Sequence, residues 1–164
     1  MSGHDMGTGR VHPQANIHPD ATIDAVSYIS RGASIGPNAR IRYGAHIGEG
    51  AAVRRGADIG EDVVIGRSVL IGDRVIVGEG ASIGMFSRIA DGGIIGPHVF
   101  VCPRVLVYPG VSIGRGAQIG DSVVIGKDAI IGERAWLGRA VIIGPGVRIP
   151  PDAVVDSSVM EEER

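Results

Sequence analysis

The sequence predicts an all-β fold in which short parallel strands wind into stacked, three-sided coils. The main observation is a six-residue period: every sixth residue from Val11 to Val155 is aliphatic, without a slip. The chain also contains 22 Ile against 3 Leu, and β-branched side chains favour extended backbone over helix. Finally, most of its 27 Gly stand at two fixed places in the repeat, as tight turns between short strands require.

Composition narrows the classes of function. The 164-residue chain has 16 basic and 18 acidic residues, and a formal charge of −2 gives no reason to expect binding to nucleic acid or an anionic membrane. A single cysteine, Cys102, cannot form an internal disulfide, and the first residues lack the pattern of a secretion signal. No apolar run approaches the roughly 18 residues of a membrane span. We therefore expect a cytoplasmic protein with a buried core.

The repeat assigns one short strand to each six-residue unit over residues 11–155, after an N-terminal tail at residues 1–10. The residue two places before each aliphatic position is small or Val in most units, so both share the two-residue side-chain period of a strand and point inward. The aliphatic position, called position i below, is occupied by Val11, Ile17, Ile23, Ile29, Ile35, Ile41, Ile47, Val53, Ile59, Ile65, Ile71, Val77, Ile83, Ile89, Ile95, Val101, Val107, Ile113, Ile119, Ile125, Ile131, Leu137, Ile143, Ile149 and Val155.

The turns between these strands are marked by Gly, Pro and short polar residues. Gly follows position i in 14 units and occupies position i+3 in nine more. Other occupants of i+3 tolerate positive φ, and they include Asp20, Asn38, Asp62, Asp128 and Asp152. Eight of the nine Pro stand at i+2, where no strand hydrogen bond is needed. Three units, or 18 residues, close one triangular coil, so the chain forms about eight coils without inserted loops.

Outward side chains at position i−1 fall on three faces when the chain is read in steps of 18 residues. The first two faces carry aliphatic rows, formed by Leu70, Leu106, Val124 and Ile142 on one and by Ile76, Ile94 and Ile130 on the next. Apolar stripes of this length are unusual on the surface of a monomer. Two different apolar patches on each subunit fit a three-fold ring, in which each subunit contacts its two neighbours through different faces. We therefore expect a homotrimer; the alternative is scattered exposed side chains without a role.

The third face carries aromatic and histidine side chains, and arginines occupy the turn that leaves it. These are Tyr28, His46, Phe100 and Trp136 on the face, and Arg31, Arg67, Arg104 and Arg139 at the turn. Guanidinium groups bind phosphates bidentately, so this surface is a candidate cofactor groove. Its predicted binding residues are Arg67, Arg104, Arg139, Phe100 and Trp136. The alternative is a row of solvated charges, interleaved with Glu49 and Asp121.

The uninterrupted repeat resembles the hexapeptide-repeat, or isoleucine-patch, transferase family over residues 11–155. Ala135-Trp136-Leu137-Gly138 and the Pro150-Pro151 segment are also similar to parts of its sugar and antibiotic acetyltransferases. The resemblance implies a left-handed parallel β-helix, a homotrimer, and acyl transfer from acyl-CoA, such as acetyl-CoA, to an amine or hydroxyl of a small molecule. The cofactor would lie in a groove between subunits. Active members commonly extrude a loop from the coil, so its absence favours a rival interpretation, a non-catalytic β-helix scaffold or assembly subunit.

Acyl transfer requires a base that deprotonates the acceptor and N–H donors for the oxyanion. His98 is the candidate catalytic base because it lies in the least regular part of the repeat, where Ala90, Cys102 and Tyr108 replace the Gly after position i. His46 is the alternative base. A structural interpretation of His98 is also open, since histidine is enriched at positive φ and could simply occupy the turn.

A nucleophilic cysteine and a metal centre are not expected. Outward neighbours on one strand lie about 7 Å apart, too far for a hydrogen bond between Cys102 and a base, so a thiol in an interface is favoured. A divergent metalloprotein resembling γ-class carbonic anhydrase is the second alternative. That branch holds zinc with three histidines, two of them five residues apart, a spacing that the repeat lacks; we therefore expect no metal. Residues 156–164 form a charged C-terminal tail.

Overall fold

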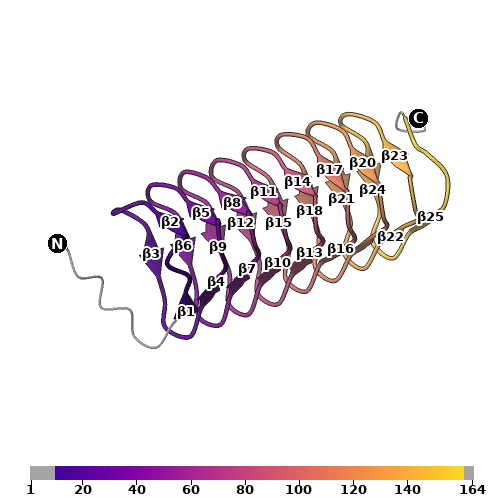
Figure 1. The fold of residues 1–164 in the computed structure, drawn as a ribbon. Helices are drawn as coiled ribbons and strands as arrows, with labels where there is room; N and C mark the ends of the chain where they lie inside the picture. Colours follow the sequence, from indigo (N-terminus) through magenta and orange to yellow (C-terminus); the bar gives the residue numbers. More distant parts are fainter. Residues whose placement is uncertain (1–9, 161–164) are drawn as a thin grey trace.

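The computed structural model describes residues 10–160 and shows a chain wound regularly about one axis (Figure 1). The first and last strands lie at opposite ends of the coil. Three parallel sheets run along the coil and form its three sides. No helix occurs in this part of the chain, so it offers no helical segment able to cross a membrane.

Each sheet contains every third strand of the chain. Sheet A contains β1 (Arg10–Val11), β4 (Tyr28–Ile29), β7 (His46–Ile47), β10 (Val64–Ile65), β13 (Ser82–Ile83), β16 (Phe100–Val101), β19 (Gln118–Ile119), β22 (Trp136–Leu137) and β25 (Val154–Val155). Sheet B contains β2 (Asn16–Ile17), β5 (Ser34–Ile35), β8 (Ala52–Val53), β11 (Leu70–Ile71), β14 (Arg88–Ile89), β17 (Leu106–Val107), β20 (Val124–Ile125) and β23 (Ile142–Ile143). Sheet C contains β3 (Thr22–Ile23), β6 (Arg40–Ile41), β9 (Asp58–Ile59), β12 (Ile76–Val77), β15 (Ile94–Ile95), β18 (Ser112–Ile113), β21 (Ile130–Ile131) and β24 (Arg148–Ile149).

The register follows the repeat in every strand pair. Ile65 pairs with Ile47 on one side and Ile83 on the other, and the same shift of 18 residues relates neighbours throughout all three sheets. Sheet A is the predicted third face, sheet B the first and sheet C the second. The structure therefore confirms the predicted parallel β-helix of about eight coils.

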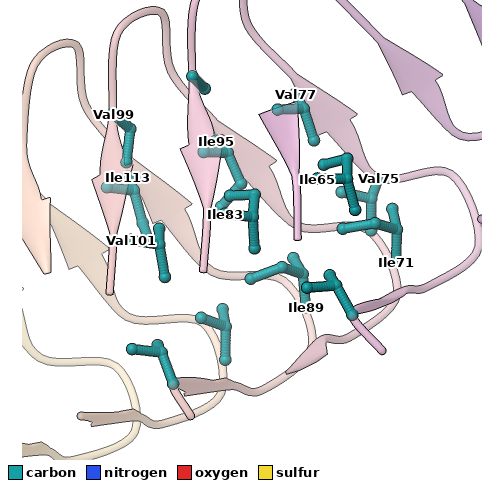
Figure 2. Close-up of a cluster of buried hydrophobic side chains, with 14 of the residues drawn as sticks. Ile65, Ile71, Val75, Val77, Ile83, Ile89, Ile95, Val99, Val101 and Ile113 are labelled. Carbon is teal, nitrogen blue, oxygen red and sulfur yellow. The ribbon is translucent and has the colours of Figure 1, made fainter. Parts of the chain in front are cut away.

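The interior is an aliphatic ladder built from the inward positions i and i−2. Figure 2 shows Ile83, Val101 and Ile65 pointing into the coil together with neighbours from the other sheets. All three are no more than 1% exposed. Ser27 and Ser87 are the buried polar residues in residues 10–160, and the hydroxyl of each donates a hydrogen bond to a carbonyl on the next coil. Because positions i and i−2 fill this packed apolar core, the core determines which side chains of each strand point inward.

Most corners have the predicted left-handed backbone at position i+3. All nine Gly at this position have φ between 65° and 74°, and Asn38, Asp62, Asp128 and Asp152 have φ between 53° and 61°. The prediction is wrong for Asp20, which is absent from the positive-φ residues; its N–H instead donates to His18 Nδ1 at 3.1 Å. His12 and Gln14 make the same contact, so both histidines serve as turn residues of the first coil.

The described part of the C-terminal segment closes one edge of the last coil. Val159 forms a parallel bridge with Ile143, its N–H donates to the Ile142 carbonyl at 2.8 Å, and it accepts the N–H of Gly144 at 2.6 Å. Ser158 Oγ accepts the Ile142 N–H at 3.0 Å. These bonds satisfy backbone groups of β23 that would otherwise end the sheet unpaired.

Candidate functional site

His98 lies at the corner that joins sheet C to sheet A, between β15 and β16. Its φ of 57° is left-handed, and its N–H donates to the Glu79 carbonyl of the preceding coil at 2.9 Å. The imidazole lies over Gly80, where a Cβ atom would stand 2.5 Å from His98 Nδ1. The side chain is exposed and forms no hydrogen bond with any side chain among residues 10–160. The corner therefore presents a solvent-facing imidazole held against a glycine.

His46, the alternative base, is in a different environment. It lies outward on β7 in sheet A, and its ring stacks on Tyr28 of β4 with ring centroids 5.8 Å apart and planes 26° from parallel. His46 and His98 are separated by nearly three coils, or about 14 Å along the axis at the spacing of a β-ladder. The structure thus does not bring the two histidines together, and each would have to act alone.

The predicted arginine row is not uniform. Arg104 donates from Nη2 to both carboxylate oxygens of Asp121 at 2.8 and 2.9 Å, while Arg139 Nε stands 3.9 Å from the same carboxylate. The Ser122 hydroxyl and then Arg104 hold the pKa of Asp121 below its usual range. Arg67, by contrast, has no acidic partner within residues 10–160. Arg31 and Arg67 are therefore the row members without an ion pair among residues 10–160, whereas Arg104 pairs with Asp121, as the solvated-charge alternative expects.

The predicted aromatic pair lies on sheet A without mutual contact. Phe100 of β16 and Trp136 of β22 both lie opposite Gln118 of β19, which separates them by two coils. The ring of Trp136 turns back over Gly138, where a Cβ would stand 3.1 Å from the indole Cη2. The two rings are 52% and 42% exposed. They provide two separate flat surfaces along the same side of the coil.

Cys102 directly follows Phe100 and Val101 of β16 and is half-buried. Burial, and secondarily the charge of Asp121, raises the pKa of its thiol. The Ser87 hydroxyl donates to the Cys102 carbonyl at 3.2 Å and accepts the Val105 N–H at 3.1 Å, which fixes the backbone beneath it. A thiol in this setting stays protonated at neutral pH, which does not suit a nucleophile.

Sequence reasoning missed an apolar corner beside the arginine row. Met85 and Phe86, between β13 and β14, are 47% and 54% exposed, and Phe86 has a φ of 61°. Backbone hydrogen bonds join this corner to Arg67 on one side and to Arg104 on the other, each at 3.0 Å. The signal was present in the sequence, since most occupants of this turn position are Gly or small polar residues.

Sheets B and C carry open hollows, and sheet C carries an ion pair, that the sequence did not single out. On sheet C, Nε and Nη2 of Arg42 each donate a hydrogen bond of 2.7 Å to the Asp58 carboxylate. This contact holds the pKa of Asp58 below its usual range. A hollow beside this pair is lined by Ile76 and Glu79. No group of three or more His, Cys, Asp or Glu residues in the described chain is arranged to hold a metal ion.

Two family models match the sequence of this β-helix. The model described as the GMPPB C-terminal domain matches residues 6–108, more than half of the chain. The model described as bacterial transferase hexapeptide (six repeats) matches residues 92–127 and 116–151. The chain therefore belongs to the family described as the GMPPB C-terminal domain, and its hexapeptide repeats make it a member of the hexapeptide-repeat family of left-handed β-helices. The resemblance inferred from the repeat is thereby confirmed.

Solved structures of acyltransferases share the fold at low sequence identity. LpxA from Acinetobacter baumannii superposes with a TM-score of 0.68 at 20% identity, covering 96% of this chain and 70% of that one. The UDP-N-acetylglucosamine acyltransferase from Campylobacter jejuni gives a TM-score of 0.55 at 21% identity, covering 92% and 68%. No match was found among curated proteins. At these identities the likeness shows a common fold.

Proposed function

We propose that this protein is an acyltransferase that moves an acyl group from a CoA thioester to an amine or hydroxyl of a small molecule. The observation that carries the proposal is the exposed imidazole of His98, held over Gly80 at an irregular point of a hexapeptide-repeat β-helix. Acyltransferases of the same fold among the solved structures support it. We also propose a cytoplasmic location, from the sequence alone.

His98 acts as the general base in this proposal. Its unprotonated nitrogen accepts the proton of the acceptor as the acceptor nitrogen or oxygen attacks the thioester carbonyl carbon. The tetrahedral intermediate then collapses with cleavage of the C–S bond, and His98 returns the proton to the departing thiolate. Backbone N–H groups near the corner would stabilise the oxyanion. The proton that His98 takes from the acceptor is therefore the one that it returns to the thiolate, so no proton is gained or lost overall.

The acyl-CoA lies along sheet A in this proposal, at its border with a neighbouring subunit. Arg67, Arg104 and Arg139 supply positive charge at one corner, and Phe100 and Trp136 supply exposed rings on the adjoining sheet. Arg104 would share its guanidinium with Asp121, so Arg67 contributes most to phosphate binding. Sheet A is available because the trimer contacts fall on sheets B and C.

The homotrimer is supported by the positions of the aliphatic rows. Leu70, Leu106, Val124 and Ile142 lie on sheet B, and Ile76, Ile94 and Ile130 lie on sheet C over the same coils. In a ring with parallel coil axes, sheet B of one copy meets sheet C of the next at equal height, so the rows would cover each other. A non-catalytic scaffold would use the same contacts, and the absence of inserted loops favours that second candidate.

Binding and activity measurements separate the two candidates. Acetyl-CoA and desulfo-CoA should raise the melting temperature of an acyltransferase, whereas a scaffold should show no shift with either. His98→Asn keeps the preference for positive φ, so stability should be unchanged while CoA release with a panel of amino and hydroxy sugars falls about a hundredfold or more. His46→Asn is the matched control and should retain activity. Full activity in His98→Asn would remove His98 from the mechanism.

A further inference from the structure

The corner formed by Met85 and Phe86 places an aromatic residue at a turn position where most corners of the coil hold Gly or a small polar residue. Phe86 has a φ of 61°, a backbone conformation that is unfavourable for an L-residue with a Cβ atom. Its ring is nevertheless 54% exposed, so burial in the described chain does not offset that cost. Glycine stands at the same corner two coils earlier, at Gly50 with a φ of 65°. A strained and exposed aromatic side chain points to a function rather than to stability.

Arg67 lies directly against this corner on the preceding coil. The Phe86 N–H donates to the Arg67 carbonyl at 3.0 Å, so the two residues lie on adjacent coils at the same corner, and Met85 is the residue that follows Arg67 by one coil in its column. Glu49 precedes Arg67 by one coil in that column, yet no ion pair within 4.0 Å joins Arg67 to Glu49 or to any other acid among residues 10–160. Asp121, the next acid in that column, lies three coils beyond Arg67 and is paired with Arg104. The corner with the exposed ring is therefore bonded through its backbone to an arginine whose side chain forms no ion pair among residues 10–160.

We infer that Phe86 and Arg67 form a nucleotide subsite, in which a nucleobase stacks on the phenyl ring and a phosphate binds the guanidinium. Stacking on an aromatic side chain and bidentate phosphate binding are complementary halves of nucleotide recognition. Met85 extends the apolar surface beside the ring. This inference deepens the proposed function, because the nucleotide it assigns to the subsite is that of the CoA donor.

The position of the corner fits a donor that reaches His98. Phe86 and Arg67 lie where sheet A passes to sheet B, and His98 lies where sheet C passes to sheet A. Ser82 of β13 and Phe100 of β16 pair with each other on the outer surface between these corners. Coenzyme A carries its nucleotide and its thiol at opposite ends of an extended arm. A donor anchored at Phe86 would cross one side of the coil and present its thioester at His98.

The test measures binding by calorimetry with CoA, adenosine 3′,5′-bisphosphate and GDP. Phe86→Gly should weaken CoA and the bisphosphate about tenfold, since one base stacking contact is lost. Val26→Gly is the matched control, because Val26 is likewise an exposed residue with a positive φ of 64° on another corner. Both variants should melt at or above the temperature of the wild type, which excludes misfolding as the cause. Arg67→Gln should weaken the same ligands, and Arg31→Gln should not.

The other outcomes of this test separate the nucleotide subsite from the proposed acyl transfer. Equal CoA affinities for Phe86→Gly and the wild type would overturn the subsite while leaving acyl transfer standing. Bisphosphate binding that depends on Phe86, without turnover of acetyl-CoA, would support the subsite and refute acyl transfer. Binding of GDP alone would overturn the assignment to CoA and place the nucleotide on the acceptor. Binding of none of the three ligands, or a change only in oligomeric state by light scattering, would overturn the subsite.

Discussion

At several corners the side chain packs over the glycine that occupies the same corner of the preceding coil. His98 lies over Gly80, Asp62 over Gly44 and Asp128 over Gly110, in each case where a glycine Cβ would collide with the side chain. A left-handed residue on one coil thus covers a left-handed glycine on the preceding coil. This packing explains why the His98 imidazole is exposed and still has a defined position.

Cys102 provides a prediction at the same scale. Because burial and the charge of Asp121 raise its pKa, the thiolate form is scarce at neutral pH and the rate of alkylation should be low. The pH at which the rate with iodoacetamide reaches half its maximum should lie above that of the chain unfolded in urea. Cys102→Ala should leave acyl transfer unchanged. A midpoint below that of the unfolded chain, or a loss of activity in the variant, would restore Cys102 as a reactive group.

The strands behave as two-sided elements, and β15 shows this most clearly. Ile95 is completely buried in the core, while its neighbour Ile94 is 47% exposed on sheet C. Ile95→Ala should lower the free energy of unfolding by about 2–5 kcal/mol, because it leaves a cavity in a packed interior. Ile94→Ala removes the same atoms from the outer surface and is the matched control. Urea denaturation at two protein concentrations separates them.

The two variants should differ in how their loss of unfolding free energy depends on protein concentration. The loss in Ile95→Ala should be the same at both concentrations, because it arises within one coil. The loss in Ile94→Ala should be smaller and should change with concentration, because that side chain is expected to contact another subunit. A large, concentration-independent loss in Ile94→Ala would show that sheet C contributes to the monomer instead.

The strands were predictable because their period never slips. Position i of each unit, such as Ile65 or Ile83, became the inward residue of a two-residue strand, and the step of 18 residues became the strand pairing. The site was only partly predictable. A period places Arg104 and Asp121 at one corner, but it does not show that their side chains pair, since that depends on rotamers. Phe86 was not predicted because it occupies position i+3, which the repeat assigns to the turn and to none of the three outward faces.

At the scale of the whole molecule, the three sides of the coil differ in chemistry. Sheet C exposes Ile76, Ile94 and Ile130, sheet B carries a half-buried to exposed aliphatic row over the same coils, and sheet A exposes aromatic rings and His46. The end of sheet B is closed by Val159, which pairs with Ile143 and protects that edge. One molecule thus separates two candidate contact sides from one candidate binding side.

A charge placed on a contact side should therefore break the assembly, whereas the same charge on sheet A should not. Leu106→Glu on sheet B would bury an unpaired carboxylate against the next copy, at a cost that one aliphatic contact cannot offset. Light scattering should give a monomer mass for this variant and a trimer mass for the wild type. Val64→Glu is the control, since Val64 is 46% exposed on sheet A and should stay trimeric. A trimer in both variants, or a monomer in both, would refute the assignment of sheet B as a contact side.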